Sequence, residues 1–122
     1  MGDSKNFSGY KCIVASLSKE VDYNNYEFDN PYIKVYEFND EVKFKKYISS
    51  NFIKKIVEKC SADWLDDYEE QPLFPDVLPV AIQIVTEAIK QKKNSDFVDY
   101  LEQTKELMEI ALINDTFMEF CF

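Results

Sequence analysis

The sequence contains no arginine and no histidine, since all 14 of its cationic residues are lysines. Arginine is the preferred residue for paired contacts to phosphate and guanine, and a duplex-binding face needs clustered cations to release counterions. With 23 acidic residues, the formal net charge is −9, so we expect no direct binding of nucleic acid. The absence of histidine excludes catalytic sites that use histidine as a general base and zinc sites that use it as a ligand.

Glycine and cysteine are also scarce. Gly2 and Gly9 are the only glycines, whereas dinucleotide-binding and P-loop motifs need glycines where the backbone approaches phosphate. Cys12, Cys60 and Cys121 are odd in number and widely spaced. The sequence therefore predicts no disulfide framework, no metal site and no cofactor.

Long apolar runs are missing, since none approaches the roughly 18 to 20 residues that span a bilayer. The first six residues lack the basic and apolar regions of a secretory signal, and Asn6 stands where a myristoylation motif has Ser or Thr. These features predict a soluble cytoplasmic protein without a membrane partner.

Hydrophobic residues make up 46% of the chain and aromatic residues 16%, which is enough for one small core. We expect a single domain over residues 1–122 that is mainly α-helical, as a helical bundle. Helical spacing predicts helices over 40–60, 76–93 and 95–113, with Asp40, Asp76 and Ser95 as their N-caps. A break is expected near Ser49-Ser50-Asn51. The wide apolar face of residues 80–89 predicts that the second of these helices is the buried central one.

The N-terminal third is ambiguous. Residues 4–21 match helical spacing, and helix is the favoured interpretation there. Residues 32–38 are rich in strand-forming types, and about 10–17 is their one obvious partner. The alternative fold class is therefore α+β with a small N-terminal strand pair.

Acidic residues concentrate in two places, the first of which is residues 63–70. No lysine lies between Lys59 and Lys90, and Pro72 and Pro75 indicate a loop. The segment is either a solvated connection with Trp64 in the core, or a binding loop whose aromatic anchors are ringed by carboxylates. The candidate partner-binding residues here are Asp63, Trp64, Asp66, Asp67, Tyr68, Glu69 and Glu70.

The second concentration is an acidic stripe on the last predicted helix. Its members, Asp99, Glu102, Glu106 and Glu109, are three or four residues apart and fall opposite the apolar face. A solvated face is one explanation. The other is a partner that relieves the repulsion, because no lysine on the stripe offsets these charges.

The candidate groups for catalysis are weak. The carboxylates of residues 63–70 do not match a calcium-binding loop and look exposed, whereas a catalytic acid needs a pocket that shifts its pKa. Cys60 has no histidine or arginine to lower its pKa, so a buried structural thiol is expected. We expect no enzyme activity.

In small size, acidity, absence of catalytic groups and the aromatic and acidic segment 63–70, the chain resembles the immunity proteins of bacterial polymorphic and contact-dependent growth inhibition toxin systems. The resemblance is one of overall character. It implies a protein that neutralises one cognate toxin, often a tRNase or DNase, inside the producing cell. The basic partner would then be a toxin nuclease domain.

Two other functions are compatible with the sequence. A phage-type DNA mimic would need carboxylates spread at phosphate-like spacing over a long face, which the last helix partly offers. A structural or adaptor domain would use its acidic surface for solubility alone. The neighbouring reading frame discriminates among the three, because an adjacent toxin gene favours an immunity protein.

Overall fold

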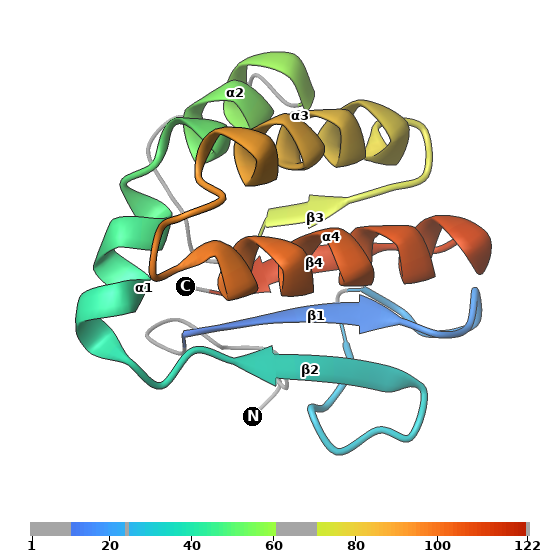
Figure 1. Cartoon of the computed structure of the whole chain (residues 1–122). Coiled ribbons are helices and arrows are strands. Elements are labelled where there is room, and N and C mark those ends of the chain that lie inside the picture. The colour runs from blue at the N-terminus through green and yellow to red at the C-terminus, as the bar shows by residue number, and fades with distance from the viewer. Residues whose placement is uncertain (1–10, 24, 61–70, 122) are drawn as a thin grey trace.

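The computed structural model describes residues 11–23, 25–60 and 71–121, which form a mixed α+β fold (Figure 1). The strands are β1 (Cys12–Ser16), β2 (Ile33–Glu37), β3 (Gln71–Leu73) and β4 (Met118–Cys121). The helices are α1 (Glu41–Ile48), α2 (Asn51–Cys60), α3 (Leu78–Gln91) and α4 (Val98–Ile113).

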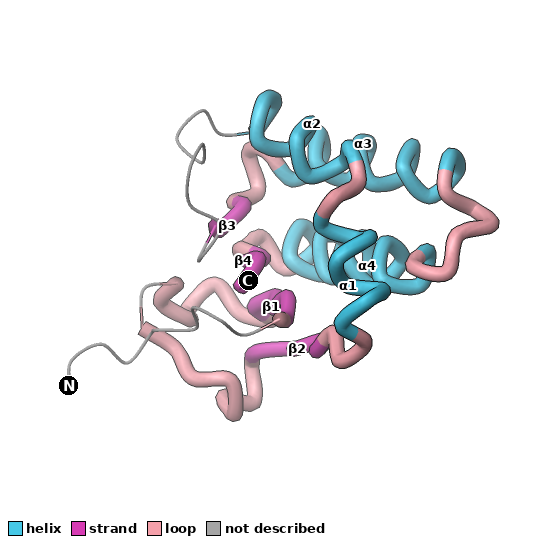
Figure 2. The backbone as a smooth tube through the Cα atoms, turned by 90° about the vertical axis from the view of Figure 1, so that its left-hand side faces the viewer, coloured by secondary structure: helices cyan, strands magenta, loops and turns pink. Residues whose placement is uncertain are grey.

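The four strands form one antiparallel sheet in the order β2-β1-β4-β3. The first and last strands of the chain are therefore neighbours at the centre of the sheet. The helices lie on one side of the sheet and the connection between β1 and β2 lies on the other, as the edge-on view in Figure 2 shows.

The expected helical bundle is wrong, and the alternative with an N-terminal strand pair is confirmed. β1 and β2 pair antiparallel, with Val14 opposite Val35. The favoured helix over residues 4–21 is wrong at β1, where all five side chains are buried. A strand covered on both faces is apolar on consecutive residues, so its sequence lacks the alternation that identifies a half-exposed strand.

The helix predicted over 40–60 is two helices, and the break falls where it was expected. Asp40 caps α1, since its carboxylate accepts a hydrogen bond from the Lys43 backbone N–H at 3.0 Å. After α1, the Ser50 hydroxyl donates to the Tyr47 carbonyl at 2.6 Å. The serine side chain thus competes for a backbone acceptor at the end of the helix, as Ser does in turns.

The other two predicted caps are wrong. α3 begins after Val77 and α4 after Phe97, and neither N-terminus has a side-chain cap. Asp76 lies before the α3 boundary. Ser95 instead donates its hydroxyl to the Lys92 carbonyl at 2.7 Å, in the turn that separates the two helices.

The central helix is α4, and the prediction that the 76–93 helix holds this place is wrong. α4 packs against β1, α1 and α3, and its buried side chains include Leu101, Leu107 and Met108. On α3, Val80 is 42% exposed and Ile84 is half-buried, because α4 and α2 cover only part of its surface. None of the helices in the described residues is long and apolar enough to cross a membrane.

The chain reverses after α4 through a left-handed residue. Asp115 has φ 57°, a conformation that Asp tolerates better than most residues other than glycine. The Asp115 N–H donates to the Leu112 carbonyl and the Thr116 N–H to the Ala111 carbonyl, which is the Schellman pattern of a helix C-terminus. This turn directs the chain back along the sheet as β4, which the sequence reasoning did not predict.

Two hydrophobic clusters cover the two faces of the sheet. On the helical face, Ile13 and Phe120 pack with the helices. On the other face, Val14 and Phe117 pack with Tyr26 from the β1–β2 connection. The connection therefore serves as the second layer of the fold.

We expect Leu107→Ala to lower the free energy of unfolding by about 2 to 5 kcal/mol, because Leu107 is fully buried in the helical cluster. Ile113→Ala on the same helix is the control, since Ile113 is 81% exposed, and its effect should stay within about 0.5 kcal/mol. Urea unfolding followed by circular dichroism measures both. Equal losses would contradict the assigned buried face of α4.

Candidate functional site

The two predicted acidic surfaces differ in what the structure describes. The candidates Asp63, Trp64, Asp66, Asp67, Tyr68, Glu69 and Glu70 lie outside the described residues. Their role as a binding loop stays a prediction. The acidic stripe of Asp99, Glu102, Glu106 and Glu109 is described in full.

The stripe lies where helical spacing predicts it. All four carboxylates are exposed on α4, on the side opposite the residues that pack on the sheet. Two of them have lysine partners. Lys43 of α1 bonds Asp99 at 2.9 Å, and Lys105 lies 4.0 Å from Glu109. The prediction considered only lysines on the stripe itself, whereas one partner lies beside the stripe, one turn before Glu109 on α4, and the other comes from α1.

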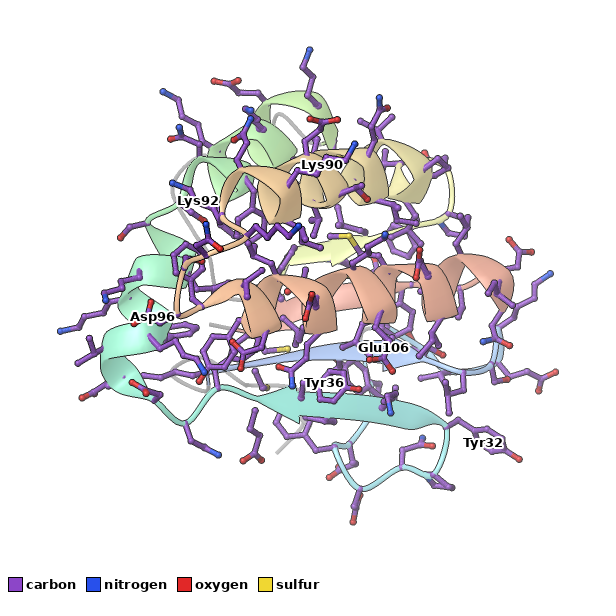
Figure 3. All side chains as sticks on the ribbon, in the orientation of Figure 1. Tyr32, Tyr36, Lys90, Lys92, Asp96 and Glu106 are labelled. Carbon is purple, nitrogen blue, oxygen red and sulfur yellow. The ribbon has the colours of Figure 1, made fainter. Side chains whose placement is uncertain are left out.

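Glu106 and Glu102 carry the remaining charge of the stripe. Glu106 accepts a hydrogen bond from the Tyr36 hydroxyl of β2 at 2.8 Å, and no ion pair involves Glu102 among the described residues. Figure 3 shows Glu106 on α4 directly beside Tyr36 on β2. A neutral donor leaves the carboxylate charge in place, so this part of α4 keeps its negative potential.

The contact also changes the acidity of Tyr36. Its hydrogen bond to Glu106 raises the pKa of the Tyr36 hydroxyl, with smaller contributions from burial and from the negative charge of Glu106. On the same strand, the Lys34 ammonium lies 5.0 Å from the centre of the Tyr36 ring. A cation at this distance is attracted by the ring face. This attraction favours the observed position of the Tyr36 ring beside Lys34.

We call this region the α4–β2 surface and define it by Tyr32, Lys34, Tyr36, Glu102 and Glu106. Tyr32 is 56% exposed and precedes β2 by one residue. Lys34 and Tyr36 alternate along β2, so they share the face that carries α4, and Tyr32 lies in the turn just before the strand. The sequence reasoning missed both tyrosines as site residues, although this alternation is visible in the sequence.

The acidic character continues around the N-terminal end of β2. There the connection from β1 forms an open pocket of about 500 Å³. Tyr32, which belongs to the α4–β2 surface, also lines this pocket. The other lining residues are Ser18, Glu20, Val21, Asp22, Asn25 and Asn30. Two carboxylates and two amides thus lie beside the exposed tyrosine.

Two of the three lysines of α1 form ion pairs within the fold. Besides the bond from Lys43 to Asp99, Lys46 bonds Asp96 at 3.0 Å. Glu41 of α1 bonds Lys11 at 3.0 Å. Exposed ion pairs of this kind contribute little to stability. These ion pairs place α1 beside the start of α4. Because Lys43 and Lys46 are used there, they do not neutralise Glu102 and Glu106.

A buried polar group lies on the opposite face of the sheet. Glu119 of β4 is fully buried and accepts a hydrogen bond from the Tyr26 hydroxyl at 2.6 Å. Burial, with the adjacent Cys121 and Glu119, raises the pKa of Tyr26. Hydrogen bonding to Cys12, together with burial, raises the pKa of Cys121. Both groups therefore stay protonated near neutral pH, and the bond to Glu119 holds the β1–β2 connection on the sheet.

Cys60 is a half-buried thiol whose sulfur lies 3.9 Å from the Val77 carbonyl. Burial and the charge of Asp76 raise its pKa. This environment disfavours the reactive thiolate form, as expected for a structural thiol. In the described part of the chain, no three side chains of metal-binding type are grouped around a common point.

No protein-family model, no curated protein and no solved structure matches this chain. The function is therefore argued from the α4–β2 surface itself.

We expect Glu106→Gln to lower the pKa of Tyr36 toward its ordinary value of about 10, because the charged acceptor of its hydrogen bond is removed. Tyrosine-labelled NMR over a pH series measures this pKa. Glu109→Gln is the matched control and should leave the pKa unchanged. Equal shifts in both variants would mean that general surface charge, and not the hydrogen bond, raises it.

The same bond predicts the direction of a pH effect on stability. Since the pKa of Tyr36 is raised in the folded protein, the bond contributes fully below about pH 10, where the unfolded tyrosine is also protonated. The contribution falls as the pH rises through the folded-state pKa. Melting temperatures should therefore converge between the wild-type protein and Tyr36→Phe at high pH.

Proposed function

We propose that this protein binds a basic protein partner through the α4–β2 surface and thereby inhibits it. One observation carries the proposal: Glu102 and Glu106 are exposed on α4, Glu106 bonds the half-buried Tyr36 of β2, and Tyr32 just before β2 is 56% exposed. Two lysines of α1, Lys43 and Lys46, are bonded to Asp99 and Asp96. The surface thus combines negative charge with aromatic side chains that can pack against a partner.

This combination fits what is known of protein interfaces. Complementary charge speeds the encounter of two proteins, and the effect falls with ionic strength. Tyrosine is enriched among residues that supply most of the binding free energy, because its ring buries a large area while its hydroxyl still forms hydrogen bonds. At a net charge of −9, the preferred partner is strongly cationic.

We infer further that the partner is a bacterial toxin nuclease domain and that the protein acts as its immunity protein. A nuclease must hold a polyanion, so its substrate groove is lined with cations. A carboxylate surface can cover such a groove without any catalytic group. The character of the chain, which resembles immunity proteins of polymorphic and contact-dependent toxin systems, supports this choice.

The α4 stripe supports a protein partner better than it supports DNA mimicry. From Asp99 to Glu109 it extends about 15 Å along the helix, and two of its carboxylates are paired with lysines. A duplex mimic needs a longer row of unpaired charges. The short stripe beside Tyr36 is better suited to a local contact within a protein interface.

The decisive experiment uses the product of the reading frame adjacent to the gene of this protein. We expect that product to arrest growth when expressed alone, and co-expression of this protein to restore growth. The association rate of the two purified proteins should fall at least about tenfold between low and physiological salt. Growth arrest without rescue, or a salt-independent rate, would contradict the proposal.

We expect the double variant Glu102→Lys, Glu106→Lys to lose most of this association rate, again by at least about tenfold, because it reverses the charge of the α4–β2 surface. Glu58→Lys is the control, since Glu58 is exposed on α2, which packs mainly on α3. Thermal melting verifies that the variants fold.

A third variant separates the two predicted acidic surfaces. It carries Asp66→Lys, Asp67→Lys and Glu70→Lys. If this variant loses binding while the α4 variant retains it, the loop 63–70 is the contact surface and the α4–β2 surface is not.

A further inference from the structure

The two edges of the sheet differ in whether they can accept another strand. The Ser16 N–H donates to the Phe117 carbonyl at 3.0 Å between β1 and β4. Backbone groups alternate in direction along a strand, so Met118 directs its groups toward its partner Leu73 on β3. Pro72 therefore directs its backbone nitrogen outward, and proline has no N–H to donate. The edge at β3 is closed at its centre.

The edge at β2 has no such block. The Phe38 N–H donates to the Lys11 carbonyl at 2.7 Å, and the Leu17 N–H to the Tyr32 carbonyl at 2.8 Å. Tyr32 and Phe38 thus turn their backbone groups toward β1, and by alternation the residues at 33, 35 and 37 turn theirs outward. Figure 1 shows β2 as the border strand of the sheet.

The outward groups are mostly unused. The Ile33 N–H donates to the Asn30 carbonyl at 3.0 Å. Among the described residues, no hydrogen bond uses the outward N–H groups of Val35 and Glu37. Val35 is half-buried and Glu37 is exposed, so solvent reaches this edge and an added strand can as well.

The two faces beside this edge have opposite chemistry. On the α4 face, the edge strand carries Lys34 and Tyr36, and Tyr36 bonds the Glu106 carboxylate of α4. On the other face, Ile33 and Val35 belong to the hydrophobic cluster around Tyr26. Side chains of an added strand alternate between these faces at about 4.8 Å from β2. A cation suits the first face and an apolar residue the second.

We propose that an extended segment with alternating cationic and apolar residues adds to the outer edge of β2 as a fifth strand. The proposal rests on the proposed function and names the part of the basic partner that binds. Main-chain hydrogen bonds to Val35 and Glu37 provide the docking, and the alternating side chains provide the selectivity. Lysine on an edge strand can oppose pairing with another strand. If Lys34 has this role, its removal should strengthen binding of the added segment.

The test uses a synthetic peptide of alternating Lys and Val, eight residues long. Alternate residues of the peptide are N-methylated, which removes the N–H donors of one edge. The other edge can still pair with β2, but the peptide cannot build a sheet with copies of itself. We expect saturable binding to the full chain and at least tenfold slower hydrogen exchange at the Val35 and Glu37 amides, measured by NMR. A peptide of the same sequence with both edges methylated should not bind.

Two variants of the protein at Val35 test the same main-chain contact between β2 and the peptide. Val35→Pro removes one outward N–H, which an edge strand tolerates, and should weaken peptide binding at least tenfold. Val35→Ala keeps this N–H and should bind within about threefold of the wild-type protein. If Val35→Pro fails to fold, the comparison of the two peptides on the wild-type protein decides the question.

Three results would overturn the inference. Equal binding of the two peptides would show that charge alone attracts them, which contradicts strand addition and leaves the proposed function intact. Binding of neither peptide would contradict an open edge, while growth rescue by the full protein tests the proposed function separately. Tighter binding by Lys34→Ala together with no binding by the wild-type chain would identify β2 as a protected edge.

Discussion

The pairing of β1 with β4 is the contact on which the rest of the structure depends. Its register places Cys12 opposite Cys121 and Val14 opposite Glu119. Both strands are buried along their whole length, because helices cover one face and the β1–β2 connection covers the other. β2 and β3 each attach to one member of this pair, and α4 packs across β1. The sheet therefore forms only when the two ends of the chain meet.

The buried contact between Tyr26 and Glu119 extends the same dependence to the second layer. It joins a loop residue to the final strand across 93 positions in the sequence. A carboxylate without a hydrogen-bond donor would be costly at this depth. Aromatic contacts of Phe117 with Tyr23 and Tyr26 accompany it. The β1–β2 connection is thus held by a polar contact at its centre and by ring packing around it.

The fold also decides which charges remain available. Lys43 and Lys46 lie close to Asp99 and Asp96 because α1 reaches the start of α4. Glu106, farther along α4, bonds Tyr36 of the border strand instead. One small region thereby combines negative charge, tyrosine side chains and an open strand edge. The proposed binding of a basic partner and the proposed strand addition both follow from this combination.

Local patterns in the sequence predicted the helices over 40–60, 76–93 and 95–113, the cap at Asp40, the break at Ser49-Ser50 and the exposed carboxylates of α4. Each of these features depends on residues within a few positions of each other. The strand-forming residue types of 32–38 also indicated β2. β3 and β4 were not predictable in this way. β3 has three residues, and Glu119 interrupts the apolar character of β4 with a charge whose partner, Tyr26, is distant in sequence.

The order of the strands, the choice of α4 over α3 as the central helix and the pairing of Tyr36 with Glu106 were decided by tertiary structure. Each depends on contacts between residues far apart in the chain, and a local pattern does not specify such partners.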